Sequence, residues 1–467
     1  MLTATRPFSL IIFGASGHLA KIKIYPALYV LFLKKRLPAS FSIVGYARTA
    51  MDTGAFRALV GEAVRADLEE VNATLLEEFL SHVHYRAGQY DKVDDFQALA
   101  AQLTELEGNE AAVRLAYLSI PPDVFGAVLE NLSAGGVRNT DFRCILEKPV
   151  GYNLASFKVL KKQLMDSFKE SEIYLLDHYL GKEAVRNLYY LRSGNPIFER
   201  VFDHELMHHV EVAAIESAGI SSRAGYFDKS GTLRDMVQSH LLMALSLLTM
   251  RLGGEDDIQA GRYAALKEWS VAEGPLSEVI VQGQYEGYAQ EKDVAAGSRS
   301  NTYVALRLQS RCERYKGIPF VIKTGKKLDR KETRISVQFK PASNALVGNA
   351  PNQLDVILQG EAGLKLHLQT KLGGSEPAFR PLVLADPLVC VGDCLPEHGL
   401  LLLEAINGIR RWFLTFEEVE ASWALVDPLQ THLDDPQTPL VSYPAGSRGP
   451  AQADAWIAGH GLGWLAC

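Results

Sequence analysis

Two apolar runs joined through a glycine turn and a helical stretch constrain the fold more than any other feature of this chain. The runs are "FSLIIFG" (residues 8–14) and "FSIVGYAR" (residues 41–48), and the helical stretch is "LAKIKIYPALYVLFLKKR" (residues 19–36). Continuous apolar strands connected through a helix are typical of parallel sheets, whose strands are buried on both faces. The sequence therefore predicts an α/β doubly wound domain at residues 1–176.

The strand pattern changes after residue 200. Segments such as "HHVEVAAIES", "TYVALRLQS" and "LKLHLQTK" alternate apolar and polar residues, which is typical of half-buried strands in an antiparallel sheet. A chain of 467 residues is longer than one hydrophobic core usually supports. We therefore expect a second, α+β domain with a large, mainly antiparallel sheet at residues 177–467. "GEDDIQAGR" (residues 254–262) is predicted to be an exposed loop.

The charge and hydropathy of the chain exclude some partners. The formal net charge is −7, from 48 basic and 55 acidic residues, which disfavours nucleic acid or an anionic membrane surface as the main partner. The N-terminal apolar run is too short for a signal peptide, and no later segment is long enough to span a bilayer. We expect a cytoplasmic protein.

The glycine turn predicts a dinucleotide site. Gly14 and Gly17 allow a tight turn and a close approach of the backbone to a pyrophosphate at the start of a helix. Any turn of this kind favours glycine, but here the strand–turn–helix context is present. Arg48 and Thr49 end the second strand, where an acidic residue would bind the ribose of NAD. An arginine there favours the 2′-phosphate of NADP; the alternative is a solvated arginine at a strand end.

A second cluster lies in "LLDHYLGKEAVRNL", where Asp177, His178, Tyr179 and Lys182 occupy six positions. A solvated helix N-terminus is one interpretation, and a phosphate clamp beside a catalytic carboxylate is the other. A phosphate dianion is best held by a cation, an imidazole and a phenol that converge on its oxygens. In "ILEKPVG", the proline favours an extended Lys148, so that its ammonium projects from the carboxyl end of a buried strand.

Several motifs occur in order along most of the chain. They are "FGASGHLAKIKIYPAL", "GYAR", "YLSIPPDVF", "EKPVG", "DHYLGKEAVRN", "RAGYFDKSGTLRDMVQSHL", "GIPFVIKTGKKL" and "YPAGSRGP". Together they resemble the glucose-6-phosphate dehydrogenase family, from about residue 9 to about residue 455. "DHYLGKE" is the most specific of these motifs, and the glycine turn is the least.

The resemblance implies an NADP-dependent oxidation of glucose 6-phosphate to the 6-phosphoglucono-lactone, the entry step of the oxidative pentose phosphate pathway. His240 in "MVQSHLL" would be the general base and Asp177 its partner. A lone histidine on an apolar helix is more often a core residue, and only the resemblance favours a base here. Imidazole suits proton transfer near neutral pH, and a carboxylate fixes its tautomer. No metal is needed.

The resemblance also assigns binding residues and an assembly. It implies a Rossmann-type cofactor domain and a homodimer or higher homo-oligomer formed through the large sheet. The positions that would bind the sugar phosphate are Lys148, His178, Tyr179, Lys182, Glu216, Asp235, Lys326, Lys331 and Gln359. The positions that would bind the cofactor are Gly14, Ala15, Ser16, Gly17, His18, Leu19, Lys21, Arg48, Thr49, Pro121 and Lys148.

The chain departs from the family pattern at several positions. His18 replaces an aspartate in the first turn of the helix. The positive end of the helix dipole lies there, and it disfavours extra positive charge on an imidazole. Phe202 and Asp203 replace a tryptophan–asparagine pair, and Gly360 replaces a proline after Gln359. These changes motivate two alternatives: a divergent relative that oxidises another hexose phosphate or a modified sugar, and a catalytically silent NADPH-binding sensor.

The adjacent pair His208 and His209 invites a metal site. Because neighbouring residues of a strand point to opposite faces of a sheet, chelation by this pair is not expected.

Overall fold

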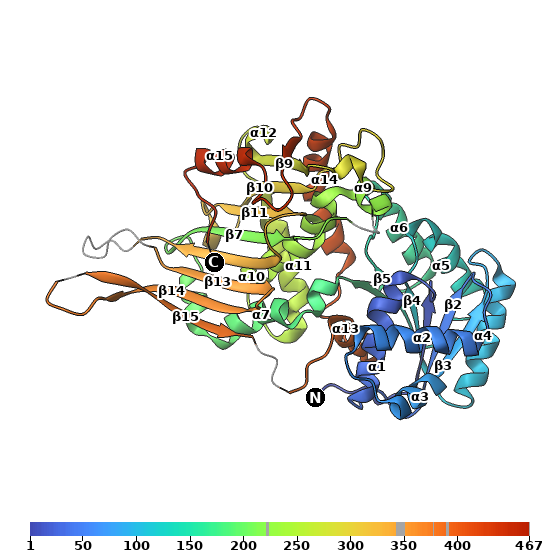
Figure 1. Ribbon diagram of the computed structural model, residues 1–467. Coiled ribbons are helices and arrows are strands. Elements are labelled where there is room, and N and C mark those ends of the chain that lie inside the picture. Colours follow the sequence, from blue (N-terminus) through green and yellow to red (C-terminus); the bar gives the residue numbers. More distant parts are fainter. Residues whose placement is uncertain (221–223, 342–350, 377, 389–391, 467) are drawn as a thin grey trace. The chain divides into compact units, whose positions relative to one another are not determined.

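The computed structural model describes residues 1–220, 224–341, 351–376, 378–388 and 392–466. The chain forms two compact units (Figure 1). The first comprises Met1–Lys182 and Gly392–Phe416, and the second comprises Glu183–Val391 and Glu417–Cys467. Among the described helices, none combines the length and the apolar character needed to cross a membrane.

The first unit is built on a six-stranded sheet in the order β3-β2-β1-β4-β5-β6 (Figure 1). All its neighbouring strands pair in parallel, and β1, β2 and β4 are buried along their whole length. The strand order reverses at β1, as in doubly wound dinucleotide-binding folds, and the predicted fold class of this part is confirmed. The strands are β1 (Phe8–Phe13), β2 (Phe41–Ala47), β3 (Val83–Ala87), β4 (Val113–Leu118), β5 (Phe142–Glu147) and β6 (Ile173–Leu176).

Helices connect these strands. The predicted first helix starts as a short π-helix, η1, whose turns are wider than those of an α-helix. The helices of this unit are η1 (Ala20–Ile24), α1 (Tyr25–Leu33), α2 (Thr53–Asp67), α3 (Ala73–Ser81), α4 (Val93–Glu107), α5 (Phe125–Ala134), α6 (Leu154–Ser167), the 3₁₀ turn η4 (His178–Gly181) and, from the returning segment, α13 (Glu397–Asn407).

The second unit is built on a ten-stranded sheet in the order β15-β14-β13-β12-β7-β11-β10-β9-β16, with β8 beside β10. Its pairs are antiparallel except β7–β11 and β9–β16, which confirms the predicted mainly antiparallel sheet. The strands are β7 (Met207–Ile215), β8 (Trp269–Val271), β9 (Ile280–Tyr285), β10 (Tyr303–Ser310), β11 (Phe320–Gly325), β12 (Glu332–Phe339), β13 (Gln353–Gln359), β14 (Gly363–Lys371), β15 (Phe379–Pro387) and β16 (Val441–Tyr443).

Helices pack against this sheet, among them η6 on β7 and β11, and α7 on β13. The long helix α14 contains Pro428. The helices are α7 (Glu183–Gly194), α8 (Pro196–Val201), α9 (Ala224–Thr232), the π-helix η6 (Leu233–Leu241), α10 (Leu242–Thr249), α11 (Ile258–Glu268), α12 (Leu276–Val279), α14 (Phe416–Asp434) and α15 (Ala451–Gly459).

The prediction of an exposed loop at residues 254–262 is wrong in its second half. Ile258 begins α11, and Arg262 is completely buried. Its guanidinium pairs with the Glu418 carboxylate of α14 at 2.7 Å, and that side chain is equally buried. The charged residue that suggested a solvated loop is therefore part of an internal ion pair that attaches α11 to α14.

Four strands of the large sheet meet at one end and position the groups described below. Gly325, at the end of β11, and Glu332, at the start of β12, both lie opposite Ile215, at the end of β7. Thr333 of β12 pairs with Gln359, at the end of β13. Residues that follow β7, β11 and β13, or precede β12, therefore gather at this end of the sheet.

Candidate functional site

The turn after β1 has the geometry of a phosphate cradle. Gly14 adopts a φ of +77°, and a Cβ atom there would lie 2.2 Å from the Ser119 carbonyl oxygen at the end of β4. The Gly17 N–H closes the turn by donating to the Gly14 carbonyl at 2.8 Å. Ala15 is buried and accepts a hydrogen bond from the Tyr25 hydroxyl at 2.5 Å. Only glycine fits at residue 14, and a glycine turn of this kind at the start of a helix lets backbone N–H groups approach a pyrophosphate.

The residues after the turn belong to the start of the first helix. His18 is exposed, Leu19 is half-buried and precedes η1, and Lys21 lies half-buried in η1. Pro121, which follows β4 and the turn after it, is exposed. These positions lie at the carboxyl end of the parallel strands, where open α/β sheets bind their ligands.

Arg48 is exposed at the end of β2, and its guanidinium carbon lies 5.7 Å from the centre of the Tyr90 ring. The Tyr85 hydroxyl donates to the Thr49 carbonyl at 2.6 Å, and the hydroxyls of Ser16 and Thr49 lie 3.4 Å apart. Arg48 is thus supported on an aromatic face rather than being surrounded only by solvent. No sequence motif had indicated a role for Tyr90.

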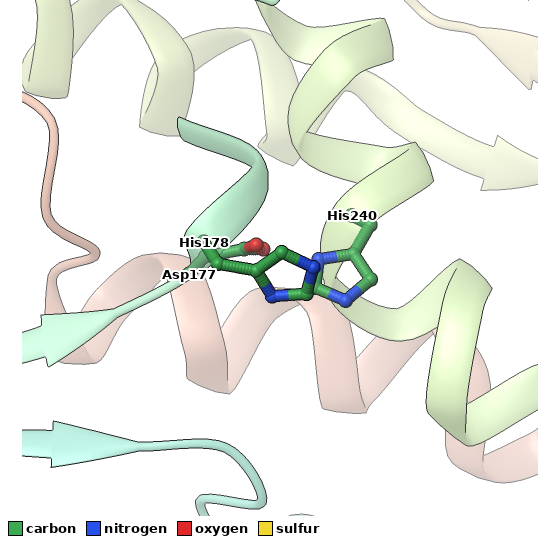
Figure 2. Close-up of side chains that lie close together, drawn as sticks. All are labelled: Asp177, His178 and His240. Atoms are coloured by element: carbon green, nitrogen blue, oxygen red, sulfur yellow. The ribbon is translucent and has the colours of Figure 1, made fainter. Parts of the chain in front are cut away.

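The segment after β6 forms a capped turn. Asp177 is completely buried, and its carboxylate accepts a hydrogen bond from the Tyr179 backbone N–H at 3.0 Å, which caps η4. The Lys182 ammonium lies 3.7 Å from the centre of the Tyr179 ring. Figure 2 shows Asp177 and His178 on this turn and His240 on η6. The cation and the phenol predicted to bind phosphate are thus neighbours.

Lys148 directly follows β5, and its peptide bond to Pro149 is cis. The preceding carboxylate, Glu147, accepts a hydrogen bond from the Tyr117 hydroxyl and another from His398 Nε2 at 3.0 Å. Burial and the Glu147 charge raise the pKa of Tyr117, so its hydroxyl stays a donor. The sequence singled out Lys148 but gave Glu147 and His398 no role.

Three of the predicted sugar-binding side chains form a cluster in the second unit. The Lys326 ammonium, directly after β11, lies 2.5 Å from the Glu216 carboxylate, directly after β7. It also lies 3.9 Å from the Asp235 carboxylate on η6. A cation between two carboxylates presents both donors and acceptors, which is the combination that sugar hydroxyls require.

Lys331 and Gln359 lie at the same end of the sheet. Lys331 is exposed and precedes β12, and Gln359 is half-buried at the end of β13. A Cβ atom at Gly360 would lie 3.4 Å from the Lys331 carbonyl oxygen. The Thr333 hydroxyl donates to the Gln359 side-chain oxygen at 3.5 Å.

The π-helix η6 carries both Asp235 and His240, five residues apart. Residues five apart in an α-helix point in different directions, but the i→i+5 repeat of a π-helix brings them to the same side. His240 is buried, with 4% of its surface exposed. The widened helix therefore presents an imidazole and a carboxylate together, and π-helical turns often occur at functional sites.

The departures from the family pattern have structural roles. Phe202 is buried, and the Asp203 carboxylate accepts hydrogen bonds from the backbone N–H groups of Glu205 and Leu206. His208 is exposed and His209 is buried, although their Nδ1 atoms lie 2.9 Å apart.

Comparisons with known proteins cover both units. The model of the "Glucose-6-phosphate dehydrogenase, NAD binding domain" matches residues 11–187, and that of the "Glucose-6-phosphate dehydrogenase, C-terminal domain" matches residues 189–465. The chain belongs to the glucose-6-phosphate dehydrogenase family. The family predicted from the motifs is thereby confirmed, and the first unit is a nicotinamide-dinucleotide-binding domain.

Individual members of the glucose-6-phosphate dehydrogenase family are similar to this chain over nearly its whole length. A glucose-6-phosphate 1-dehydrogenase of Schizosaccharomyces pombe is 36% identical over 95% of this chain and 91% of its own length. That of Chlamydia pneumoniae is 35% identical over 98% of this chain and 96% of its own. A solved glucose-6-phosphate dehydrogenase in complex with its substrate glucose 6-phosphate has a TM-score of 0.90 and 30% identity, and both chains are covered completely.

Proposed function

We propose that this protein oxidises glucose 6-phosphate at C1 to 6-phosphoglucono-1,5-lactone, with NADP as the hydride acceptor. The observation that carries the proposal is the cluster of Lys326 with the Glu216 and Asp235 carboxylates, since Asp235 lies on η6, the helix that also carries the buried His240. A buried imidazole on the same helix as part of a cluster that suits sugar hydroxyls has the composition of a site for alcohol oxidation. The relatives' names support the choice of sugar.

Charge and geometry divide the substrate between two groups of residues. His178, Tyr179 and Lys182 would hold the 6-phosphate, because together they offer an ammonium, an imidazole and a phenol. The sugar hydroxyls would be held by Lys148, Glu216, Asp235, Lys326, Lys331 and Gln359.

The reaction needs one proton acceptor in the protein. His240 would take the proton of the C1 hydroxyl while the C1–H bond breaks and C1 becomes a carbonyl carbon. Asp177 would accept a hydrogen bond from the other nitrogen of the same imidazole, fix its tautomer and stabilise the imidazolium. The nicotinamide, when bound, accepts the hydride with its electron pair.

The cradle after β1 fits the pyrophosphate of a dinucleotide, since the φ of Gly14 and the lack of room for a Cβ atom both require glycine. Gly14, Ala15, Ser16, Gly17, His18, Leu19, Lys21, Thr49, Pro121 and Lys148 would line this site. Arg48, supported by Tyr90, would bind the 2′-phosphate that distinguishes NADP from NAD.

The test is nicotinamide reduction, followed by absorbance, with glucose 6-phosphate and either NADP or NAD. We expect reduction with NADP, and a loss of roughly 10³-fold or more in kcat for His240→Asn. His204→Asn, which changes an exposed histidine of the same unit, is the matched control. Reduction with another hexose phosphate alone would favour the divergent relative. Cofactor binding without turnover on any sugar phosphate would favour the silent sensor.

We also propose a homodimer formed through the large sheet. The terminal strand β15 exposes Phe379, Val383 and Leu384, with 39–52% of each residue accessible. An exposed apolar edge strand is a liability unless another surface covers it. A cytoplasmic location remains the prediction of the sequence.

A further inference from the structure

His398 contacts two segments that are far apart in the sequence. It is the second residue of α13, with 3% of its surface exposed. Its Nε2 lies 3.0 Å from the Glu147 carboxylate, so this nitrogen donates and the imidazole is the Nε2–H tautomer or is charged. Its ring also lies nearly parallel to that of His178, with the ring centres 6.1 Å apart and an interplanar angle of 15°.

The first contact fixes the start of the lysine turn. Glu147 is the last residue of β5, and Lys148 follows it directly. The same Glu147 oxygen accepts the hydroxyl of Tyr117, a fully buried residue of β4. A carboxylate held by two donors from different elements has little rotational freedom, and the backbone that leads into Lys148 is restrained with it.

The start of α13 also packs against η4, the turn that carries His178. A Cβ atom at Gly181 would lie 2.6 Å from the Glu397 carbonyl oxygen, so the first turn of α13 approaches the backbone of η4 as closely as a glycine allows. His398 follows Glu397 directly, and its ring lies beside that of His178. The start of α13 is thus a common support for the lysine turn and for η4.

We propose that His398 is a positioning residue for the sugar phosphate, which sets the spacing between Lys148 and His178 without touching the substrate. The inference rests on the proposed function for the roles of these two residues. A shift of about 1 Å in a binding group is enough to weaken binding or slow a reaction roughly a hundredfold. Because one imidazole bonds the carboxylate that precedes Lys148 and lies beside the His178 ring, its loss would change the spacing of these two groups.

The experiment compares the kinetic constants of two variants. His398→Ala should raise KM for glucose 6-phosphate about tenfold and KM for NADP by a smaller factor, about threefold or less, because Lys148 also lines the proposed cofactor site. His398→Gln should recover most of the loss, because its amide nitrogen can reach the place of Nε2 and donate to Glu147. Glu147→Gln, which keeps the volume but removes the charge, should raise the same KM, and it serves if His398→Ala does not fold.

Leu403→Ala, at a fully buried position of the same helix, controls for a general loosening of α13. A general loosening, as in Leu403→Ala, would raise the KM values for sugar and cofactor by similar factors. The inference is overturned if His398→Ala does the same, or if neither His398→Ala nor Glu147→Gln raises KM for the sugar. It is also overturned if His398→Gln gives no recovery.

A wild-type protein that does not oxidise glucose 6-phosphate would refute the proposed function alone. Crystal structures of wild type and His398→Ala then test the positioning directly. A change of about 1 Å or more in the spacing of Lys148 and the His178 ring supports it, and an unchanged spacing rejects it.

Discussion

Arg48 illustrates how a single residue acquires a role from its surroundings. A solvated arginine pays side-chain entropy each time it binds a phosphate. The Tyr90 ring lies 5.7 Å from its guanidinium carbon and is itself packed against Phe13 and Tyr46. The arginine is therefore partly ordered before any ligand arrives, and the proposed preference for NADP should depend on both residues.

We expect Arg48→Ala to lower kcat/KM for NADP about 10- to 100-fold, because charge-assisted hydrogen bonds to a phosphate contribute about 1.5–3 kcal/mol. The value for NAD should change less than about threefold. Tyr90→Leu should give a smaller loss with NADP, about two- to fivefold, since exposed cation–π contacts contribute about 0.5–1 kcal/mol. Arg65→Ala, an exposed cation of the same unit, is the control. Equal losses with both cofactors would contradict the role of Arg48.

At the scale of elements, β7 contains a buried histidine whose protonation is linked to folding. Burial, and secondarily the neighbouring His208, lower the pKa of His209 to about 4. In the unfolded chain a histidine has a pKa of about 6.5. Because the unfolded chain binds this proton more tightly, the stabilising contribution is fully present above pH 6.5 and is lost as the pH falls toward 4.

The free energy of unfolding should therefore fall by about 2 kcal/mol between pH 7 and pH 5 on account of His209 alone. His209→Gln removes the titrating group, so the variant should lose about 2 kcal/mol less over this range than the wild type does. Urea unfolding at both pH values measures the difference. His204→Gln should keep the wild-type pH dependence, and a His209→Gln profile parallel to that of the wild type would show that the buried imidazole is not responsible.

Elements whose pattern is local were predictable, and those that depend on distant partners were not. The buried strands β1 and β2 and the alternating strands of the large sheet were evident from hydropathy alone. The start of α11 was missed because Arg262 suggests solvent until Glu418, 156 residues later in the chain, is placed beside it. The π-helix that brings Asp235 and His240 to one face has no sequence signature, since the same residues would also fit an α-helix.

At the scale of the whole molecule, the chain does not divide at a single point. Gly392–Phe416 returns to the first unit, and no local pattern in these residues distinguishes α13 from a helix of the second unit. The motifs identified Lys148 and His178 as site candidates, but they did not predict that α13 contacts the segments of both residues. What the sequence encodes locally is the set of proposed site residues, whereas their spacing depends on contacts made across hundreds of residues.

Assembly is the remaining property at this scale, and the proposed homodimer uses the outer strand of the large sheet. Val383 and Leu384 are adjacent on β15 and so point to opposite faces, yet about half of each is exposed. Apolar side chains on both faces of a terminal strand are consistent with coverage by a second copy of the chain.

We expect light scattering to give twice the mass of one chain for the wild type. The double variant Val383→Glu, Leu384→Glu should give the mass of one chain. Val159→Glu, at an exposed apolar position of α6, should stay dimeric. A dimer that survives the double substitution would place the interface elsewhere, because two buried glutamates facing their copies could not be accommodated without several kcal/mol of desolvation and repulsion.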